Sequence, residues 1–286
     1  MFSKGLNKYI FAIDVSLILY ILISTLLIVY QYTSIDAAYN NIIARFLMLV
    51  ISIQIIYLQK NYTTPFMEFL HIILPYFYII YFYYEAPNLN LFHLGDWTQI
   101  SMESFDNYFL GNSTLIVFSN FMANKTLVQI GYLIQLIAYA AVPALVFISY
   151  AKKSEIGKKY GFISYSSLLV FILIMQIFPT NINEYAITYS GIIGGIYELF
   201  QIIIYGTTIS TINILVGFFI VSALFFITID KRISLVLSFL WIISSLAGIV
   251  LNQYYFSGTI LTWIIAPIVF FIMNNLYKRL DKLGIN

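Results

Sequence analysis

The sequence contains no cysteine and two histidines. The absence of cysteine excludes disulfide scaffolds, thiolate metal sites, iron–sulfur clusters and cysteine nucleophiles. A histidine-rich zinc site is excluded as well, because two histidines are too few for it. We therefore expect no metal and no other cofactor.

Charged residues are scarce, at 9% of the chain, whereas hydrophobic residues make up 61%. A soluble domain averages about 25% charged and about 45–50% apolar residues, so both a soluble domain and a disordered chain are excluded. No basic run indicates a nucleic-acid partner. The apolar residues occur in blocks of about 20, the length needed to cross a bilayer. The sequence therefore predicts a multi-pass membrane protein whose partners are membrane lipids and, as an alternative, other membrane subunits.

Continuous apolar runs predict helices, since a membrane barrel would show short alternating strands. We expect an all-α, polytopic transmembrane helix bundle with about eight spans in a single membrane domain over 1–286. The domain comprises three N-terminal spans (9–84), an outer loop rich in aromatic and acidic residues (85–127) and a five-span bundle (128–276). The predicted spans are 9–30, 42–59, 66–84, 128–149, 162–179, 210–229, 233–251 and 259–276.

The basic residues predict the orientation. With both termini in the cytoplasm, twelve of the fourteen Lys and Arg residues fall inside, and Arg45 and Lys125 fall outside. This distribution follows the positive-inside rule and supports an even number of spans. We therefore expect a cell-membrane protein with cytoplasmic N- and C-termini.

The outer side is acidic and aromatic. Seven acidic residues lie there, and the loop 85–127 carries many aromatic rings, which prefer the headgroup layer. We expect this loop to lie on the membrane as short amphipathic helices, and segment 192–205 to do the same.

Asp14, Glu68 and His71 are ionisable residues near the predicted cytoplasmic ends of spans 1 and 3. Glu68 and His71 are three residues apart and share a helix face. Glu68 and His71 could form a proton relay or a weak metal site. The alternative, which we favour, is that these residues lie near enough to the interface to reach water, or pair with neighbouring lysines. His93 is predicted on the opposite side from His71, so the two cannot ligate one haem.

The middle of the chain carries a series of short motifs. Asp106-x-x-Phe-Leu-Gly111 is followed by Leu127-x-Gln-x-x-Tyr-Leu133, by Pro143 inside a span and by Ile177-Phe-Pro-Thr180 at the end of the next span. Their order resembles the inositolphosphotransferase-like branch of the type 2 phosphatidic acid phosphatase superfamily. The resemblance covers about 105–275 and implies a polytopic fold with a lipid-phosphate site on the outer membrane face.

That family uses a P-S-x-H motif and a later H-x-x-x-D pair for proton donation, nucleophilic attack and orientation of the nucleophile. Here Ser210-Thr-Ile-Asn213 stands in the first position, so Asn213 replaces the first histidine. Tyr254 replaces the nucleophile and Gly258 the aspartate. Asparagine does not shuttle protons near neutral pH, and tyrosine, with a free pKa of about 10, is a poor substitute for imidazole. The resemblance thus implies a member whose catalytic motifs are degenerate.

The expected pocket is lined by neutral polar groups from Thr211, Asn213, Gln253 and Tyr254, together with Gly258. The cations that would hold phosphate are also few. Possible contributors from the outer side are Arg45, His93, Asp96 and Asp106. An excess of acids repels a phosphate, whereas neutral donors suit a sugar or glycerol headgroup or a partner helix.

Three functions follow as hypotheses. The first is a lipid-phosphatase-like protein without catalytic residues, acting as a lipid-binding or scaffold subunit. The second is an active lipid phosphatase or phosphotransferase that uses unusual residues. The third is a structural subunit of a membrane complex or a transporter. No charged residue lies at mid-depth in spans 4 to 8, which disfavours a transporter.

The predicted orientation places Lys152 and Lys159 in the cytoplasm. An impermeant lysine reagent applied to intact cells should leave both unmodified, while Lys125 reacts. Lysates provide the control, since all three then react. Labelling of Lys152 or Lys159 in intact cells would show that the predicted orientation is wrong.

Overall fold

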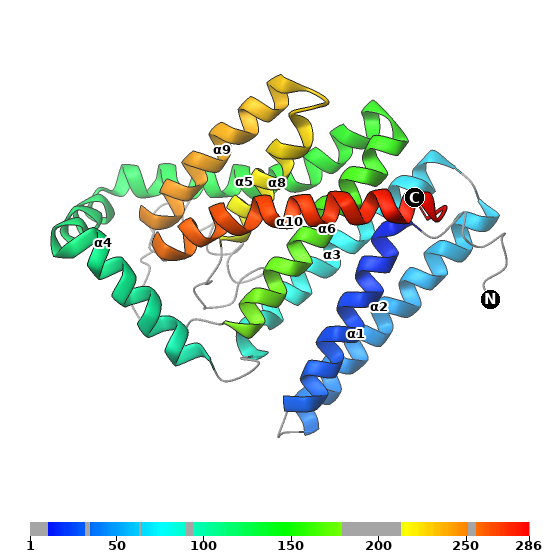
Figure 1. The fold of residues 1–286 in the computed structure, drawn as a ribbon, viewed down its shortest axis with the longest axis horizontal. Coiled ribbons are helices and arrows are strands. Elements are labelled where there is room, and N and C mark those ends of the chain that lie inside the picture. Colours follow the sequence, from blue (N-terminus) through cyan, green and yellow to red (C-terminus); the bar gives the residue numbers. More distant parts are fainter. Residues whose placement is uncertain are drawn as a thin grey trace. The chain divides into compact units, whose positions relative to one another are not determined.

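The structure, a computed structural model, describes residues 11–31, 35–62, 64–89, 94–178, 213–250 and 256–285. These residues form helices and no strand (Figure 1). The helices are α1 (Ala12–Gln31), α2 (Ile35–Asn61), α3 (Pro65–Leu89), α4 (Gly95–Ala123), α5 (Lys125–Lys152), α6 (Ser154–Ile177), α8 (Ile214–Phe226), α9 (Lys231–Val250) and α10 (Phe256–Lys282). The predicted all-α fold is confirmed.

Seven of these helices are long and apolar enough to cross a membrane: α1, α2, α3, α5, α6, α9 and α10. Each coincides with one of the eight predicted spans. The remaining prediction, 210–229, corresponds to α8, whose 13 described residues are fewer than the roughly 20 that a span needs. Residues 210–212 lie outside the described part of the chain. A multi-pass membrane protein is therefore indicated by the structure as well as by the sequence.

Short polar side chains begin several helices. The Thr64 hydroxyl accepts the backbone N–H of Met67 before α3. Asn124 accepts the N–H groups of Thr126 and Leu127 at the start of α5. Asp230 does the same for the first turn of α9. These residues satisfy helix N–H groups that have no intrahelical partner, so the helix starts are encoded locally.

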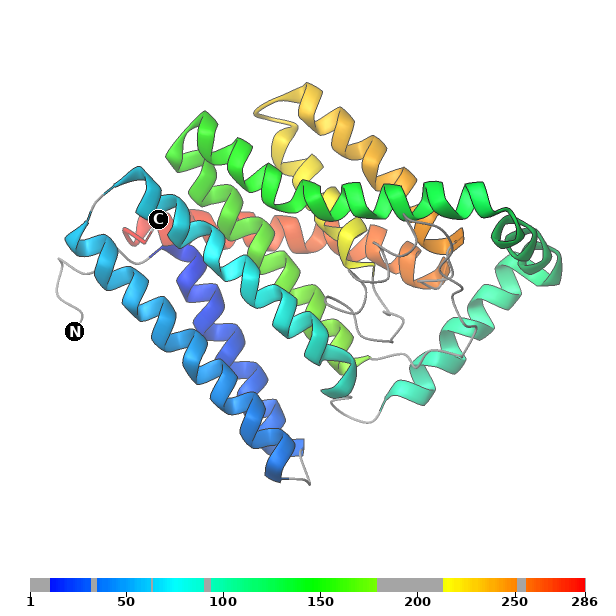
Figure 2. The same ribbon diagram turned by 180° about the vertical axis from the view of Figure 1, so that it is seen from behind.

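The chain divides into two compact units. Unit 1 comprises Met1–Ile80, Pro143–Val170 and Val269–Asn286. Within it α1 and α2 lie side by side (Figures 1 and 2). Helix α6 contacts both α1, through a 2.6 Å contact between the Ser16 and Ser166 hydroxyls, and α3, through a 2.5 Å contact between Tyr76 and Ser164. Polar contacts thus join the helices of unit 1 in addition to apolar packing.

Unit 2 comprises Tyr81–Val142 and Phe171–Ile268. Its centre is α8, in which all residues except Leu224 are buried. Helix α9 packs antiparallel against α8, and the Ser234 hydroxyl donates to the Ala223 carbonyl across the turn between them. A helix that is apolar all round must be enclosed by other helices or lipid, which explains the position of α8.

The predicted outer loop 85–127 contains α4, whose two halves meet at Gly111. Gly111 has φ 64° and ψ 170°, a conformation that glycine adopts without steric cost. The segment is helical, as expected, and its position on the membrane surface stays a prediction. Segment 192–205, for which we made the same prediction, lies outside the described residues.

Gly217 of α8 allows close packing against Phe171 of α6. A Cβ atom at Gly217 would lie 2.6 Å from Cε2 of the Phe171 ring, which is fully buried. We expect Gly217→Ala to destabilise the protein by about 1–3 kcal/mol, the usual cost of overpacking a core. The measurement is thermal unfolding of the purified protein in micelles.

The matched control is the double variant Gly217→Ala with Phe171→Leu, which removes the ring atoms in conflict. The double variant should cost less than the sum of the two single changes. Simple additivity of the two single effects would contradict this packing argument.

Candidate functional site

Two of the predicted pocket residues lie together in unit 2. Asn213 precedes α8, and its Oδ1 accepts the Val216 N–H at 3.1 Å. The Asn213 backbone N–H donates to Thr262 Oγ1 at 3.0 Å. The Thr262 hydroxyl in turn donates to the Gly258 carbonyl at 2.7 Å. Asn213 and Gly258 are therefore connected through one threonine, and both take part in hydrogen bonds at helix starts.

Asn213 is 1% exposed, and within the described residues its side-chain Nδ2 makes no hydrogen bond. The other predicted pocket residues, Thr211, Gln253 and Tyr254, lie outside the described part of the chain. Of the five residues predicted to line the pocket, the structure therefore describes Asn213 and Gly258.

Asp106 has a definite role in unit 2. Its carboxylate oxygens accept the backbone N–H groups of Phe256 and Ser257, each at 2.8 Å. These two N–H groups begin α10, so an acid on α4 caps a helix that starts 150 residues later in the chain. A carboxylate is favourable there, because the first N–H groups of a helix lack partners and carry partial positive charge.

The remaining outer-loop candidates are dispersed. Asp96 lies in the first turn of α4 and is exposed. Arg45 belongs to unit 1, where it is 1% exposed inside α2; its guanidinium donates to Ser24 Oγ of α1 and to the Asn41 carbonyl. His93 lies outside the described residues. Arg45 therefore binds α2 to α1, although the sequence suggested an outer-face position.

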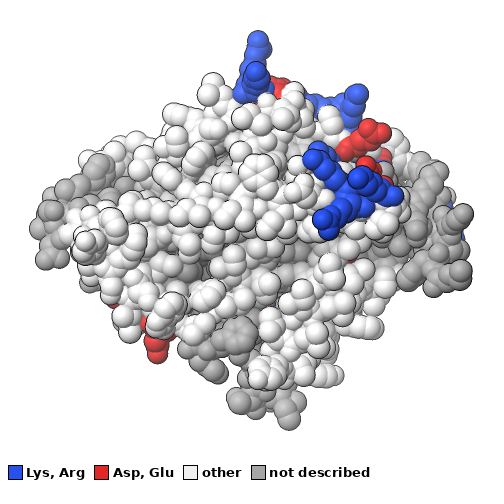
Figure 3. Space-filling view, viewed as in Figure 1, with Lys and Arg blue, Asp and Glu red and all other residues white. Residues whose placement is uncertain are grey.

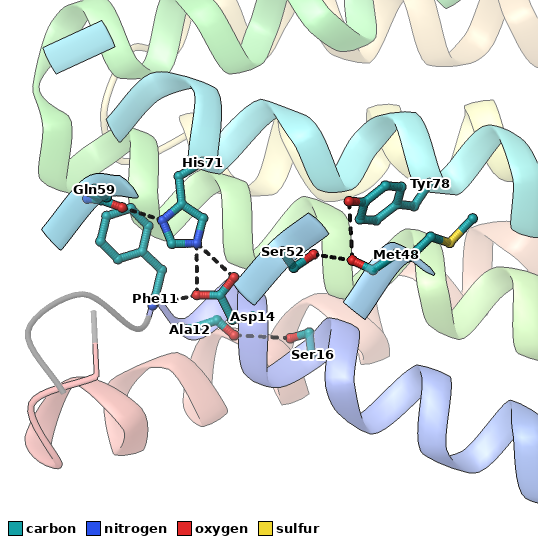
Figure 4. A network of polar contacts seen from close by, with 9 residues as sticks. All are labelled: Phe11, Ala12, Asp14, Ser16, Met48, Ser52, Gln59, His71 and Tyr78. Atoms are coloured by element: carbon teal, nitrogen blue, oxygen red, sulfur yellow. Dashed lines mark hydrogen bonds and ion pairs between the residues drawn. The ribbon is translucent and has the colours of Figure 1, made fainter. Parts of the chain in front are cut away.

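The most concentrated group of ionisable residues lies in unit 1. His71 of α3 is 2% exposed, and its Nε2 lies 2.8 and 2.9 Å from the two carboxylate oxygens of Asp14 on α1. Its Nδ1 contacts Oε1 of Gln59, near the end of α2. Figure 4 shows the imidazole between these two partners. One ring thus connects three helices.

In this arrangement both ring nitrogens face oxygen atoms that accept hydrogen bonds. The imidazole therefore lies between the Asp14 carboxylate and the Gln59 amide, with one ring nitrogen facing each. Asp14 also accepts the Phe11 N–H at 2.8 Å, an interaction that caps α1 (Figure 4). The Phe11 ring stacks on His71 with centroids 4.4 Å apart. Asp14 and His71 are thus almost completely buried in the protein.

A second ion pair lies beside the first. Glu68 Oε1 is 2.8 Å from Lys158 Nζ of α6, and Glu68 Oε2 accepts the Tyr150 hydroxyl of α5 at 2.9 Å. Lys158 Nζ also lies 4.5 Å from the centroid of the Phe11 ring, a cation–π contact. The Glu68 and Lys158 side chains are about one-fifth exposed, whereas those of Asp14 and His71 are almost fully buried.

The structure distinguishes between the readings left open for Asp14, Glu68 and His71. Glu68 pairs with a neighbouring lysine, as favoured from the sequence. Asp14 and His71 pair with one another. The sequence analysis missed Gln59 as a further polar partner of His71. The sequence feature that could have indicated it is a side-chain amide next to Lys60, at the end of an apolar run. In the described residues, no three His, Asp or Glu side chains come together as a metal site.

Comparison with known proteins gave no match, since no family model, no curated protein and no solved structure matches the chain.

The contact between Asp14 and His71 predicts a measurable coupling. Asp14→Asn keeps an acceptor for Phe11 but removes the carboxylate that faces the imidazole. Removal of one partner from a buried pair costs about 3–5 kcal/mol, so we expect a clear loss of thermal stability in micelles. The double variant Asp14→Asn with His71→Gln should recover part of that loss, because no imidazole is then left without its carboxylate partner.

Glu155→Gln serves as the control, since Glu155 is an exposed carboxylate of the same unit and its removal should change stability by less than about 1 kcal/mol. Equal effects of Asp14→Asn and Glu155→Gln would mean that the buried pair contributes nothing to stability.

Proposed function

We propose that this protein is a non-catalytic, polytopic membrane protein that acts as a lipid-binding or scaffold subunit with a lipid-phosphatase-like arrangement of its later spans. The observation that carries the proposal is the use of Asn213, Gly258 and Asp106 in hydrogen bonds at the starts of α8 and α10. Groups that hold helix ends together are poor candidates for proton transfer or phosphate binding.

Phosphoryl transfer requires a nucleophile, a group that moves protons and cations that neutralise the phosphoryl oxygens. In the first position the Asn213 amide oxygen accepts a helix N–H, and an amide does not act as an acid or a base near neutral pH. Arg45, one of the two outer cations, donates to Ser24 and Asn41 within unit 1. These contacts support a protein without hydrolytic activity over an active lipid phosphatase.

The apolar exterior supports a role among lipids or membrane subunits. Large apolar side chains are exposed along the candidate spans, as at Leu26 (69%), Leu235 (74%) and Phe239 (62%). The face of the molecule in Figure 3 is largely uncharged. Such surface is stable only against lipid tails or another apolar protein, and larger exposed patches of this kind mark interaction sites.

The proposed location is the cell membrane, with both termini in the cytoplasm. Lys158 lies over Phe11, near the N-terminus, and the Tyr277 ring, near the C-terminus, contacts Phe162 of α6. Residues close to both termini therefore lie near the lysine-rich start of α6 within unit 1. The positive-inside rule supports a cytoplasmic position for this end of the unit.

The proposal predicts that the purified protein releases no phosphate from phosphatidic acid in mixed micelles at neutral or mildly acidic pH. Phosphate release is the measurement, and a lipid phosphatase with intact histidines is the positive control. Phospholipid should nevertheless co-purify with the protein.

Turnover that disappears in Tyr254→Phe or His93→Ala would overturn the proposal and establish the active-enzyme alternative. Turnover that survives both changes would indicate a contaminating enzyme.

A further inference from the structure

Besides Lys158, which pairs with Glu68, six basic residues lie on the three segments of unit 1 where α5 ends, α6 begins and α10 ends. We call this group the basic end; its members are Lys152, Lys153, Lys159, Lys278, Arg279 and Lys282. The acidic residues on the same segments are Glu155 and Asp281. Figure 3 shows one group of Lys and Arg side chains where α10 ends, with Asp or Glu side chains beside it, and further Lys and Arg side chains along the upper edge of an otherwise largely white surface. The local charge is therefore strongly positive.

Contacts between α6 and α10 bring the basic residues together. The Tyr277 ring of α10 lies 5.6 Å from the Phe162 ring of α6, centroid to centroid. One turn nearer the start of α6, the charges of Lys159 and Lys278 lie close enough to repel one another, and Asp281 offsets part of this repulsion. Like charges held together on two helices are stabilised by an anion placed between them.

Apolar surface continues directly from these charges. Arg279, Leu276 and Ile272 follow one another at helical spacing on one face of α10. All three are exposed, Leu276 at 40% and Ile272 at 50%. A cation at the end of an apolar helix stripe matches a phospholipid, in which a phosphate adjoins two acyl chains. Free phosphate would contact the basic side chains but would leave the apolar side chains of the stripe uncovered.

We propose that the basic end binds the headgroup of an anionic phospholipid, with the phosphate near Lys159, Lys278 and Arg279 and the acyl chains along Leu276 and Ile272. Clusters of Lys and Arg at the cytoplasmic ends of spans attract anionic lipids, at about 1 kcal/mol for each basic residue near the surface. This site uses residues of unit 1 and does not depend on the proposed function of the pocket in unit 2.

The test measures bound lipid on the purified full-length protein by native mass spectrometry, in micelles that contain phosphatidylglycerol or phosphatidylcholine. The wild-type protein should retain phosphatidylglycerol in preference. In Lys278→Gln with Arg279→Gln the preference should fall by up to about 30-fold, the value of two basic residues at about 1 kcal/mol each. Lys278→Arg with Arg279→Lys should preserve it, which separates loss of charge from misfolding.

The matched control is Lys231→Gln with Arg232→Gln, which removes an exposed Lys–Arg pair from the start of α9. This control should leave the preference unchanged. An equal loss in the control variant, or no preference in the wild-type protein, would overturn the proposal. Displacement of the lipid by inorganic phosphate at equal concentration would also overturn it, because the site would then recognise phosphate alone.

Discussion

A polar group within a membrane-spanning helix has no water to bond with, so it must find its partner inside the protein. This constraint explains the described polar contacts of the chain. His71 bonds to Asp14 and Gln59, and Arg45 bonds to Ser24 and to the Asn41 carbonyl. The contacts of His71 and the bond from Arg45 to Ser24 join different helices, whereas the bond to the Asn41 carbonyl stays within α2. In lipid, where helices gain little from hydrophobic association, such contacts determine which helices are neighbours.

The same constraint acts at the helix ends. The first N–H groups of α10 are satisfied by Asp106 from α4, and Asn213 satisfies one at the start of α8. These are the residues that the resemblance to lipid phosphatases would place in or near a catalytic pocket. Their hydrogen bonds give these residues a structural role at the helix ends. The presence of these residues therefore does not require a catalytic role.

The exposed charges of unit 1 lie in a different environment. Lys278, Arg279 and Lys282 are exposed at the end of α10, next to apolar surface. At that depth long basic side chains can extend toward headgroups while their aliphatic parts cover apolar surface. The buried pair of Asp14 and His71 and the exposed basic end thus represent two solutions to the presence of charge near a membrane. One encloses the charge with a protein partner, and the other leaves it at the surface, where we propose that it binds lipid.

The sequence by itself determined the helical class and the locations of seven spans, because apolar runs of about 20 residues have one stable form in a bilayer. It also suggested water or a neighbouring lysine as the partner of Asp14, Glu68 and His71, and the lysine partner is found for Glu68. Helix starts at Thr64, Asn124 and Asp230 were likewise encoded by neighbouring residues. Tertiary structure decided which distant residues meet: Asp14 with His71, Arg45 with Ser24, Asp106 with the start of α10. These partners are 57, 21 and about 150 residues apart, and apolar periodicity shows which residues lie on a helix but not which helix lies beside it.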